Sequence, residues 1–388
     1  MSSTSEPSSS DLHDFLGNYW DLFAGFILGV SALFLHLNGY TYMAVFCAGL
    51  AIASFSFTVS EIAEILAERL QEPYSSFVLT FSAVAVEILL LFMIMLESSH
   101  GAHALETVKS GIISAVIVDM NVLLGIAVFV GGLRFKEQEH NEDTSSTYTT
   151  ILLVASVALL VPSVLGYSPN GSDNNLLIAS YIIAFLLGVY YLSIFIFQTK
   201  THIHFFKATA RSRIFRLRRK RARGDEEEED DNYIFERLSI TANLVIIFAL
   251  IFLIGIIAEI FASDGMQIAT EHGISAALAG LVIAIISVSP ELFTAIKAAK
   301  ADQIQRVVNI AMGASTVSIL LTVPILMLLS PFADIRLTLD FNSLQIGALI
   351  LTVILAWKTT DNGETNYVEG ISHLMFFFAF AVIAAFYH

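Results

Sequence analysis

Residues 77–96, FVLTFSAVAVEILLLFMIML, decide the fold class of this chain. A membrane-spanning helix takes about 20 mostly apolar residues, and the one charged residue in this stretch is Glu87. Residues 274–295, ISAALAGLVIAIISVSPELFTA, repeat the pattern with Glu291 as their one charged residue. The two stretches predict membrane-spanning helices that each carry a single carboxylate.

Similar apolar runs occur along most of the chain. Of its 388 residues, 56% are hydrophobic and only 14% are charged, whereas soluble proteins carry about 25% charged residues. The predicted spans are residues 21–37, 40–66, 75–96, 108–132, 149–166, 176–198, 239–262, 274–298, 304–330, 343–358 and 367–387. The sequence therefore predicts an all-α polytopic membrane protein with about 11 transmembrane helices. Its single cysteine, Cys47, excludes a disulfide framework within one chain.

The spans divide around a charged segment, with a basic run at 211–223 and an acidic run at 225–231. We expect a cytoplasmic tail (1–20), a first transmembrane helix (21–37), a first repeat of five spans (38–199), a charged cytoplasmic loop (200–237) and a second repeat of five spans (238–388). A repeat with an odd number of spans is inverted when it recurs in one membrane, an architecture common in secondary transporters.

The distribution of basic residues sets the expected orientation, because Lys and Arg favour the cytoplasmic side. With the N-terminus inside, 18 of the 20 fall on the inner side, and only Lys109 and Arg336 fall outside. The C-terminus is then outside. No basic n-region of a secretory signal precedes the first span. A prokaryotic cytoplasmic membrane is the simplest location, with a vacuolar membrane as the alternative, and nothing points to a nucleic-acid partner.

Glu87 and Glu291 are the strongest candidate site residues. A charged side chain at the centre of a membrane helix costs about 2.5–3.5 kcal/mol on insertion scales, and these two occupy the second helix of each predicted repeat. The alternative interpretation is that each is protonated or hydrogen-bonded and only holds the bundle together. Pro290 should kink or unwind its helix next to Glu291, freeing backbone carbonyls as ligands.

A second group of polar residues in the spans could add oxygen ligands to this pair. These are Ser82, Asp119, Asn121, Ser287, Ser289, Ser315 and Ser318. Three acids nearer helix ends are candidates for the access path, namely Glu61, Glu64 and Glu259, although solvation of helix ends explains them nearly as well. Oxygen ligands suit hard cations such as Ca²⁺, Na⁺ or Mg²⁺, so Glu87 and Glu291 are the predicted metal ligands.

Two facing glutamates in a low-dielectric site predict exchange. When a cation is bound the pair can stay doubly ionised, and without one it should take up protons as a unit. An empty, fully ionised pair would repel itself strongly and cross between the two sides poorly. Cations should therefore move one way while protons move the other. We expect a secondary transporter rather than an enzyme, with no cofactor beyond the transported ions.

Around these acids the chain resembles the calcium:cation antiporter superfamily, and within it the bacterial calcium/proton and sodium-potassium/proton antiporters. Residues 64–75 (EILAERLQEPYS) with Val86-Glu87 are similar to the first α-repeat of that group. The second is represented by residues 289–292 (SPEL), Gln305-Arg306 and residues 309–315 (NIAMGAS), and the run QTKTH at 198–202 is also similar. The resemblance implies one helix plus two inverted five-helix repeats, with Glu87 and Glu291 as the central cation- and proton-binding acids.

One departure from the family leaves the ion open. Many of its calcium/proton exchangers have Gly-Asn-Ala before the key acid, where this chain has Val84-Ala85-Val86 and Val288-Ser289-Pro290. We therefore expect Ca²⁺/H⁺ exchange by alternating access, with sodium or potassium/proton antiport as the alternative. A cation channel or an intramembrane enzyme fits less well, because a filter needs a ring of ligands and an aspartyl protease needs two facing aspartates. Whether the chain acts alone or as a homo-oligomer stays open.

Overall fold

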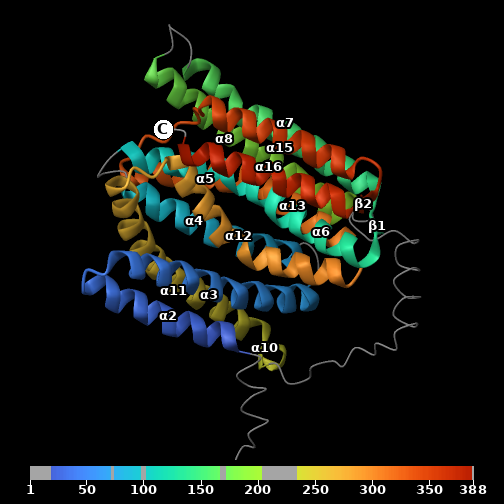
Figure 1. Cartoon of the computed structure of the whole chain (residues 1–388), viewed down its shortest axis with the longest axis horizontal. Helices are drawn as coiled ribbons and strands as arrows, with labels where there is room; N and C mark the ends of the chain where they lie inside the picture. The colour runs from blue at the N-terminus through green and yellow to red at the C-terminus, as the bar shows by residue number, and fades with distance from the viewer. Residues whose placement is uncertain (1–18, 71–73, 98–101, 167–171, 203–233, 387–388) are drawn as a thin grey trace, which may run out of the picture.

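The protein is a bundle of membrane-length helices. The computed structural model describes residues 19–70, 74–97, 102–166, 172–202 and 234–386 (Figure 1). Within these residues, ten helical stretches are long and apolar enough to cross a membrane, and a shorter apolar one covers Thr80–Leu96. Together they account for the 11 predicted spans. Most of the predicted tail and of the charged loop lies outside the described residues.

The helices follow the apolar runs of the sequence closely. Before the charged loop they are α2 (Trp20–Leu37), α3 (Thr41–Arg69), α4 (Tyr74–Leu96), α5 (Ala102–Ile117), η2 (Val118–Leu123), α6 (Leu124–Phe135), α7 (Glu142–Gly166), α8 (Asp173–Ile196) and η3 (Phe197–Thr201). After it they are α10 (Ile234–Arg237), α11 (Ile240–Glu271), α12 (Ala276–Lys300), α13 (Ile304–Val317), η5 (Ser318–Thr322), α14 (Val323–Leu329), η6 (Ser330–Ala333), α15 (Ser343–Thr360) and α16 (Tyr367–Phe386). Of these, η2, η3 and η5 are π-helical and η6 is a 3₁₀ turn.

Several helices begin at a side-chain cap, which satisfies backbone N–H groups of the first turn. Ser239 and Ser275 accept hydrogen bonds from backbone N–H groups in the first turns of α11 and α12. Asn342 and Gln345 form a reciprocal capping box at the start of α15. These caps mark where α11, α12 and α15 begin.

Two short strands outside the spans were not expected from the sequence. β1 (Glu137–Glu139) pairs antiparallel with β2 (Glu364–Asn366), and Gln138 lies opposite Thr365. The strands join the connection between α6 and α7 to the connection between α15 and α16 (Figure 1). The all-α prediction missed them because three-residue strands carry no periodic signal and depend on a distant partner.

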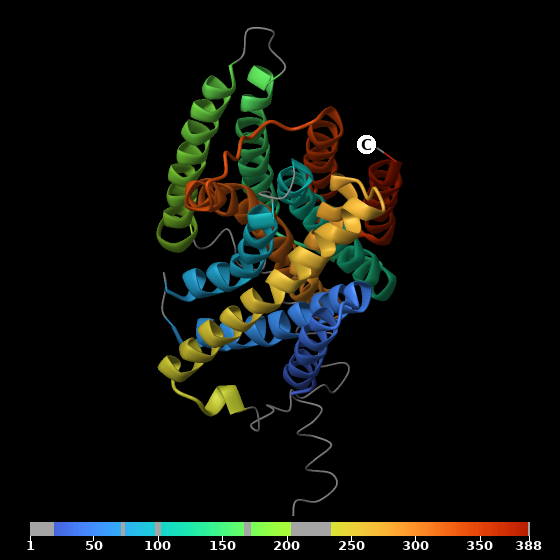
Figure 2. The ribbon, with the colours of Figure 1, turned by 90° about the vertical axis from the view of Figure 1, so that its left-hand side faces the viewer.

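The helices fall into two groups with α4 and α12 between them. α2, α3 and α11 lie together along one side, and α7, α8, α15 and α16 lie along the other (Figures 1 and 2). α4 begins at the end of the bundle where α3 ends, and α12 finishes at that same end, so α4 and α12 run in opposite directions. Their antiparallel course is what an inverted pair of repeats requires.

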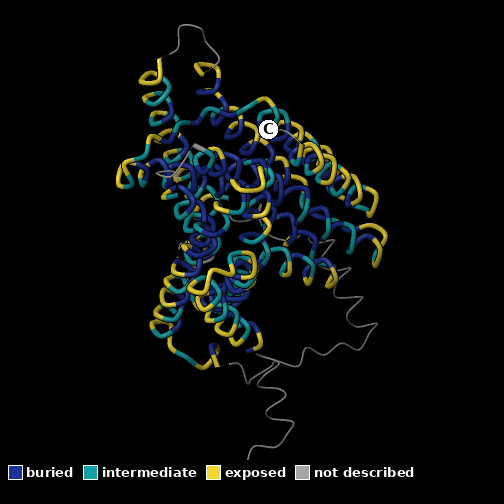
Figure 3. The backbone as a smooth tube through the Cα atoms, turned by 60° about the vertical axis from the view of Figure 1, so that its left-hand side comes forward, coloured by how far each residue is buried: buried dark blue, intermediate teal, exposed yellow. Residues whose placement is uncertain are grey.

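Glycines let the central helices approach closely. A Cβ built on Gly280 of α12 would lie 2.7 Å from the backbone carbon of Ser110, so α12 and α5 cross almost in backbone contact. Gly370 of α16 meets the backbone of α6 at Gly125 in the same way. Buried residues gather in the centre of the bundle, and the exposed residues lie on outward faces (Figure 3), where apolar side chains can meet lipid.

His140 lies between β1 and α7, outside the spans, and is buried. Its backbone N–H donates to the Gly363 carbonyl at 2.8 Å, and its Nδ1 lies 3.0 Å from Ser145 Oγ. Burial lowers the pKa of the imidazole to about 4, because the charged ring would lose its hydration. The folded protein therefore holds this ring neutral.

This arrangement predicts an acid-sensitive contribution to stability. An unfolded histidine has a pKa near 6.5, so between about pH 6.5 and pH 4 the unfolded chain binds one more proton than the folded protein. The free energy of unfolding should fall across that window by about 3 kcal/mol more in the native protein than in His140→Asn. Thermal unfolding of both proteins from pH 7 to pH 4 measures the difference. Identical pH dependence would contradict a buried neutral ring.

Candidate cation-binding site

Glu87 is buried within α4. Its Oε2 accepts a hydrogen bond of 2.8 Å from Ser318 Oγ of η5. Its Oε1 is buried and has no hydrogen bond to the described residues. One carboxylate oxygen is thus held by the opposite half of the chain, and the other is left for a ligand or a proton.

Glu291 and Asp119 complete a group of three carboxylates. Glu291 interacts electrostatically with Glu87, and Asp119 with both glutamates. Asp119 is fully buried on η2, and its Oδ2 accepts from Ser315 Oγ at 3.1 Å. Asp119 Oδ1 and Glu291 Oε2 are buried and likewise have no hydrogen bond to the described residues.

Two π-helical segments place the partners of these acids. η2 and η5 lie in the third helix of the first and second predicted repeats, and such local widenings often occur at functional sites. η5 supplies Ser318 to Glu87 of the first repeat, whereas η2 packs against α12 of the second repeat, and its Asp119 interacts with Glu87 and also with Glu291. Each acid-bearing helix therefore meets the π-helical segment of the other half. Thr322 of η5 is also buried, and its hydroxyl lies beside Glu87.

Pro290 does not unwind its helix, which was one of the two outcomes that the sequence suggested. α12 continues as one helix from Ala276 to Lys300, so the expected unwinding is absent. Proline lacks the N–H that would have bonded the Ile286 carbonyl, and Ser289 Oγ donates to that carbonyl instead at 2.7 Å. Ser287 Oγ donates to the Ala284 carbonyl of its own helix at 3.1 Å. The carbonyl freed by Pro290 is therefore already satisfied.

The other residues predicted as ligands divide into two sets. Ser315 and Ser318 contact the acids directly. Asn121 instead turns toward α15 and α16, where it bonds Thr352 and His373. Ser82 is buried on α4, five residues before Glu87. The sequence did not indicate a role for His373, because a single histidine near the end of a span forms no pattern.

The predicted access-path acids also divide. A pocket of about 240 Å³ lies between α3, α12 and the start of α13, and Glu61, Glu64 and Pro290 line it. Arg306 Nη2 donates to Glu64 Oε1 at 2.6 Å across this pocket. Glu259 is exposed on α11 and does not line it. Glu61 and Glu64 thus lie where an ion could approach Glu291 along α12.

The chemistry of the site is that of oxygen donors alone. Carboxylates and hydroxyls are the ligands of hard cations. The described residues contain no group of three or more His, Cys, Asp or Glu side chains arranged to hold a metal ion. The site is therefore a set of neighbouring carboxylates rather than a tightly convergent resident metal centre.

Comparison with known proteins gives the family. Residues 36–200 and 242–386 match the model of the sodium/calcium exchanger protein family. The chain belongs to that family. The two matched blocks lie on either side of the predicted charged loop.

Relatives and solved structures of exchangers agree with this assignment. The exchanger is 26% identical over 360 residues to the sodium-potassium/proton antiporter ChaA of Escherichia coli (strain K12), covering 91% of this chain and 93% of that protein. It is 24% identical over 308 residues to a Ca²⁺/H⁺ antiporter of Synechocystis sp., covering 78% and 80%. The structure of native YfkE shares its fold, with a TM-score of 0.72 and 18% identity over 93% of this chain and 99% of that one. The chain is thus a cation antiporter and not an enzyme.

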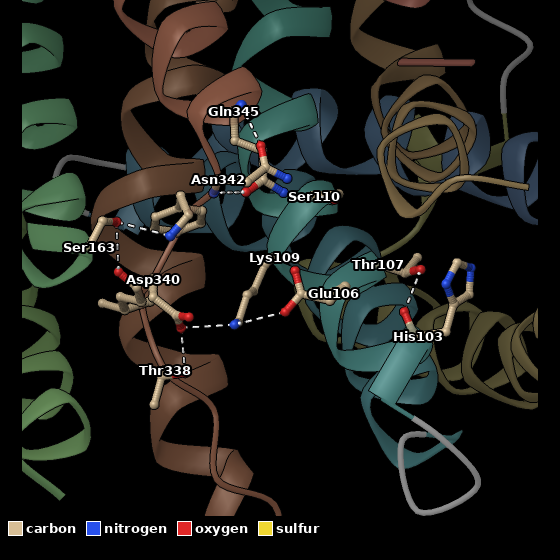
Figure 4. Close-up of polar contacts among 12 residues, drawn as sticks. His103, Glu106, Thr107, Lys109, Ser110, Ser163, Thr338, Asp340, Asn342 and Gln345 are labelled. Atoms are coloured by element: carbon tan, nitrogen blue, oxygen red, sulfur yellow. Dashed lines mark hydrogen bonds and ion pairs between the residues drawn. The ribbon is translucent and has the colours of Figure 1, made fainter. Parts of the chain in front are cut away.

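At the opposite end of the exchanger from the pocket, a buried lysine ties two connections together. Lys109 of α5 is 4% exposed, and its Nζ donates to Glu106 at 3.0 Å and to Asp340 at 2.8 Å. Figure 4 shows Lys109 between the two carboxylates, with Thr338 bonded to Asp340. One residue on, Ser110 accepts a hydrogen bond from Gln345 at 2.8 Å. These contacts fasten the segment before α15 to α5.

Removing the two carboxylates around Lys109 should lower the stability of the protein more than removing the lysine ammonium. Lys109 is buried, whereas Glu106 and Asp340 are 47% and 37% exposed, so only the ammonium depends on its partners for solvation. Glu106→Gln/Asp340→Asn should lower stability by about 3–5 kcal/mol, the usual cost of an uncompensated buried charge. Lys109→Met should cost clearly less. Thermal unfolding in detergent ranks the variants, and the reverse order would contradict this account.

Proposed function

We propose that this exchanger moves Ca²⁺ in one direction and protons in the other by alternating access, with Glu87, Glu291 and Asp119 binding both. The observation that carries the proposal is the group of three interacting carboxylates, each with a buried oxygen that has no hydrogen bond to the described residues. A buried acceptor without a partner is costly. A bound cation or a proton removes that cost.

The charge of the site favours a divalent cation. Three ionised carboxylates in a low-dielectric interior repel one another, so the empty site should hold protons rather than three negative charges. Ca²⁺ would offset two of those charges and accept six to eight oxygen ligands. Ser315, Ser318 and Thr322 supply hydroxyl oxygens nearby. Because the cation and the protons compete for the same oxygens, each would leave as the other binds.

The two ends of the bundle support alternating access. The pocket lined by Glu61 and Glu64 approaches Pro290, next to Glu291, from one end. At the other end, Lys109 and Gln345 hold the connection before α15 against α5. An ion would reach the carboxylates from the pocket in this conformation, and the fastened end would have to open for release on the other side.

The membrane orientation follows from charge. Arg69, Lys297, Lys300 and Arg306 lie at or near the pocket end, and basic residues favour the cytoplasm. We place the pocket on the cytoplasmic side of a prokaryotic cytoplasmic membrane, with the N-terminus inside and the C-terminus outside. The relatives include a vacuolar calcium ion transporter, so a vacuolar membrane is the alternative location.

The alternative cargo is Na⁺ or K⁺. It is supported by the similarity to the sodium-potassium/proton antiporter ChaA along 91% of this chain, and by the missing Gly-Asn-Ala before each glutamate. A monovalent ion would leave more negative charge at the site and so would need more bound protons. The number of protons exchanged therefore distinguishes the two cargoes.

Transport in sealed vesicles tests both roles. Purified protein in vesicles with an imposed pH gradient should take up Ca²⁺, measured with Na⁺ and K⁺ uptake and proton movement. Glu87→Gln and Glu291→Gln should each lower the initial rate by roughly thirtyfold or more, because loss of a buried charged partner costs about 2–5 kcal/mol. Glu364→Gln makes the same chemical change on exposed β2 and should leave the rate unchanged.

The outcomes separate the candidates. Uptake of Na⁺ or K⁺ alone would keep the mechanism and replace Ca²⁺ as the cargo. Coupled flux that survives both glutamine substitutions would remove these glutamates from the site. No coupled flux of any of the three ions by folded protein would overturn the proposed function.

A further inference from the structure

His373 of α16 lies fully buried inside the bundle, away from the carboxylates. Its Nδ1 is 3.1 Å from Asn121 Oδ1, and its Nε2 is 3.0 Å from Thr359 Oγ1 of α15. Asn121 Nδ2 in turn donates to Thr352 Oγ1 at 2.9 Å. A continuous chain of hydrogen bonds thus joins α15, α16 and η2.

The direction of each bond in this chain is fixed by elementary chemistry. The Asn121 amide nitrogen is used as a donor to Thr352, so the Asn121 oxygen facing His373 can only accept. His373 Nδ1 must therefore carry the proton. A neutral ring then presents Nε2 as an acceptor to the Thr359 hydroxyl. Both ring nitrogens are satisfied without a charge, which suits a ring sealed from water.

This chain of bonds holds η2 from the side opposite the carboxylates. Asp119 and Asn121 are two residues apart on η2, so their side chains leave the helix on opposite faces. Asp119 meets Ser315 on one face, and Asn121 meets His373 and Thr352 on the other. One turn on, a Cβ built on Gly125 would lie 2.9 Å from His373 Cβ, so the backbone after η2 also rests against this histidine.

We infer that His373 is a positioning residue for the cation site. It holds Asn121, and through η2 it keeps the Asp119 carboxylate turned toward Glu87 and Glu291. A leucine would fill the same space without the need for two satisfied hydrogen bonds, so a packing role alone does not explain a fully bonded histidine here. Groups that orient a ligand without touching the ion typically change affinity about 10- to 100-fold when removed. This inference rests on the proposed function.

The test compares His373→Leu with the native protein in vesicles. The Ca²⁺ concentration for half-maximal uptake should rise about 10- to 100-fold, while the maximal rate changes much less. The shift in unfolding temperature that saturating Ca²⁺ produces in purified protein should shrink in parallel. His373→Gln, which keeps a donor and an acceptor, should recover part of both. Ser372→Ala is the matched control, because Ser372 is exposed and bonds its own helix at the Val368 carbonyl.

A double-mutant cycle tests the route through Asn121. If His373 acts through Asn121, then His373→Leu/Asn121→Leu should be no weaker in Ca²⁺ affinity than Asn121→Leu alone, since the two effects share one path. If the two losses of Ca²⁺ affinity multiply in the double variant, His373 does not act through Asn121. Thr359→Val removes the bond to Nε2 while keeping the ring, so it carries the test if His373→Leu does not fold.

The failures are distinguishable. Native protein that neither transports nor is stabilised by Ca²⁺, Na⁺ or K⁺ would overturn the proposed function and leave His373 no cation site to position. Native protein that transports, with folded His373→Leu or Thr359→Val within twofold of its cation affinity, would overturn the inference alone.

Discussion

A carboxylate inside a bilayer has no water to solvate it, and the structure of this exchanger is organised around that constraint. Glu87, Glu291 and Asp119 are held together in the interior, and each keeps one oxygen without a hydrogen bond to the described residues. Buried polar groups are normally paired, so these oxygens support the proposed binding of a cation or a proton. Hydroxyl groups of the surrounding helices donate to the other oxygens of Asp119 and Glu87, through Ser315 and Ser318. Among the described residues, no ion pair joins a basic side chain to these carboxylates, so they would stay available to a mobile cation or a proton.

The cationic groups lie at the ends of the bundle instead. Arg306 pairs with Glu64 at the pocket, and Lys109 pairs with Glu106 and Asp340 at the opposite end. The first pair is half exposed and can rearrange at little cost. The second contains a buried ammonium, so that end can open only if Lys109 keeps a carboxylate partner or gains water. The difference in burial makes the pocket end the easier one to keep open.

The π-helical segments η2 and η5 link the two halves of the chain at the site. η5 brings Ser318 to Glu87, and η2 packs against the helix of Glu291 and brings Asp119 to both glutamates. η2 is held on both faces, by Ser315 near the site and by the Asn121–His373 chain behind it. Close glycine contacts at Gly280 and Gly370 bring the supporting helices against α5 and α6. A site assembled from both halves changes whenever the halves move, which is what alternating access requires.

The sequence by itself determined the spans and their number, because apolar runs of membrane length are local features. It also singled out the two glutamates as lone charges within such runs. It also placed Ser315, Ser318 and Asp119 among the candidates, although it ranked Asp119 behind the glutamates. Only the tertiary structure decided that Asp119 joins Glu87 and Glu291, that Asn121 turns away to His373, and that Ser289 satisfies the carbonyl freed by Pro290. The β1–β2 pair and the pocket at Glu61 and Glu64 were also beyond the sequence. Each depends on contacts between side chains of spans that are far apart in the sequence. The rotation and crossing of the helices determine those contacts, and no pattern along one segment shows them.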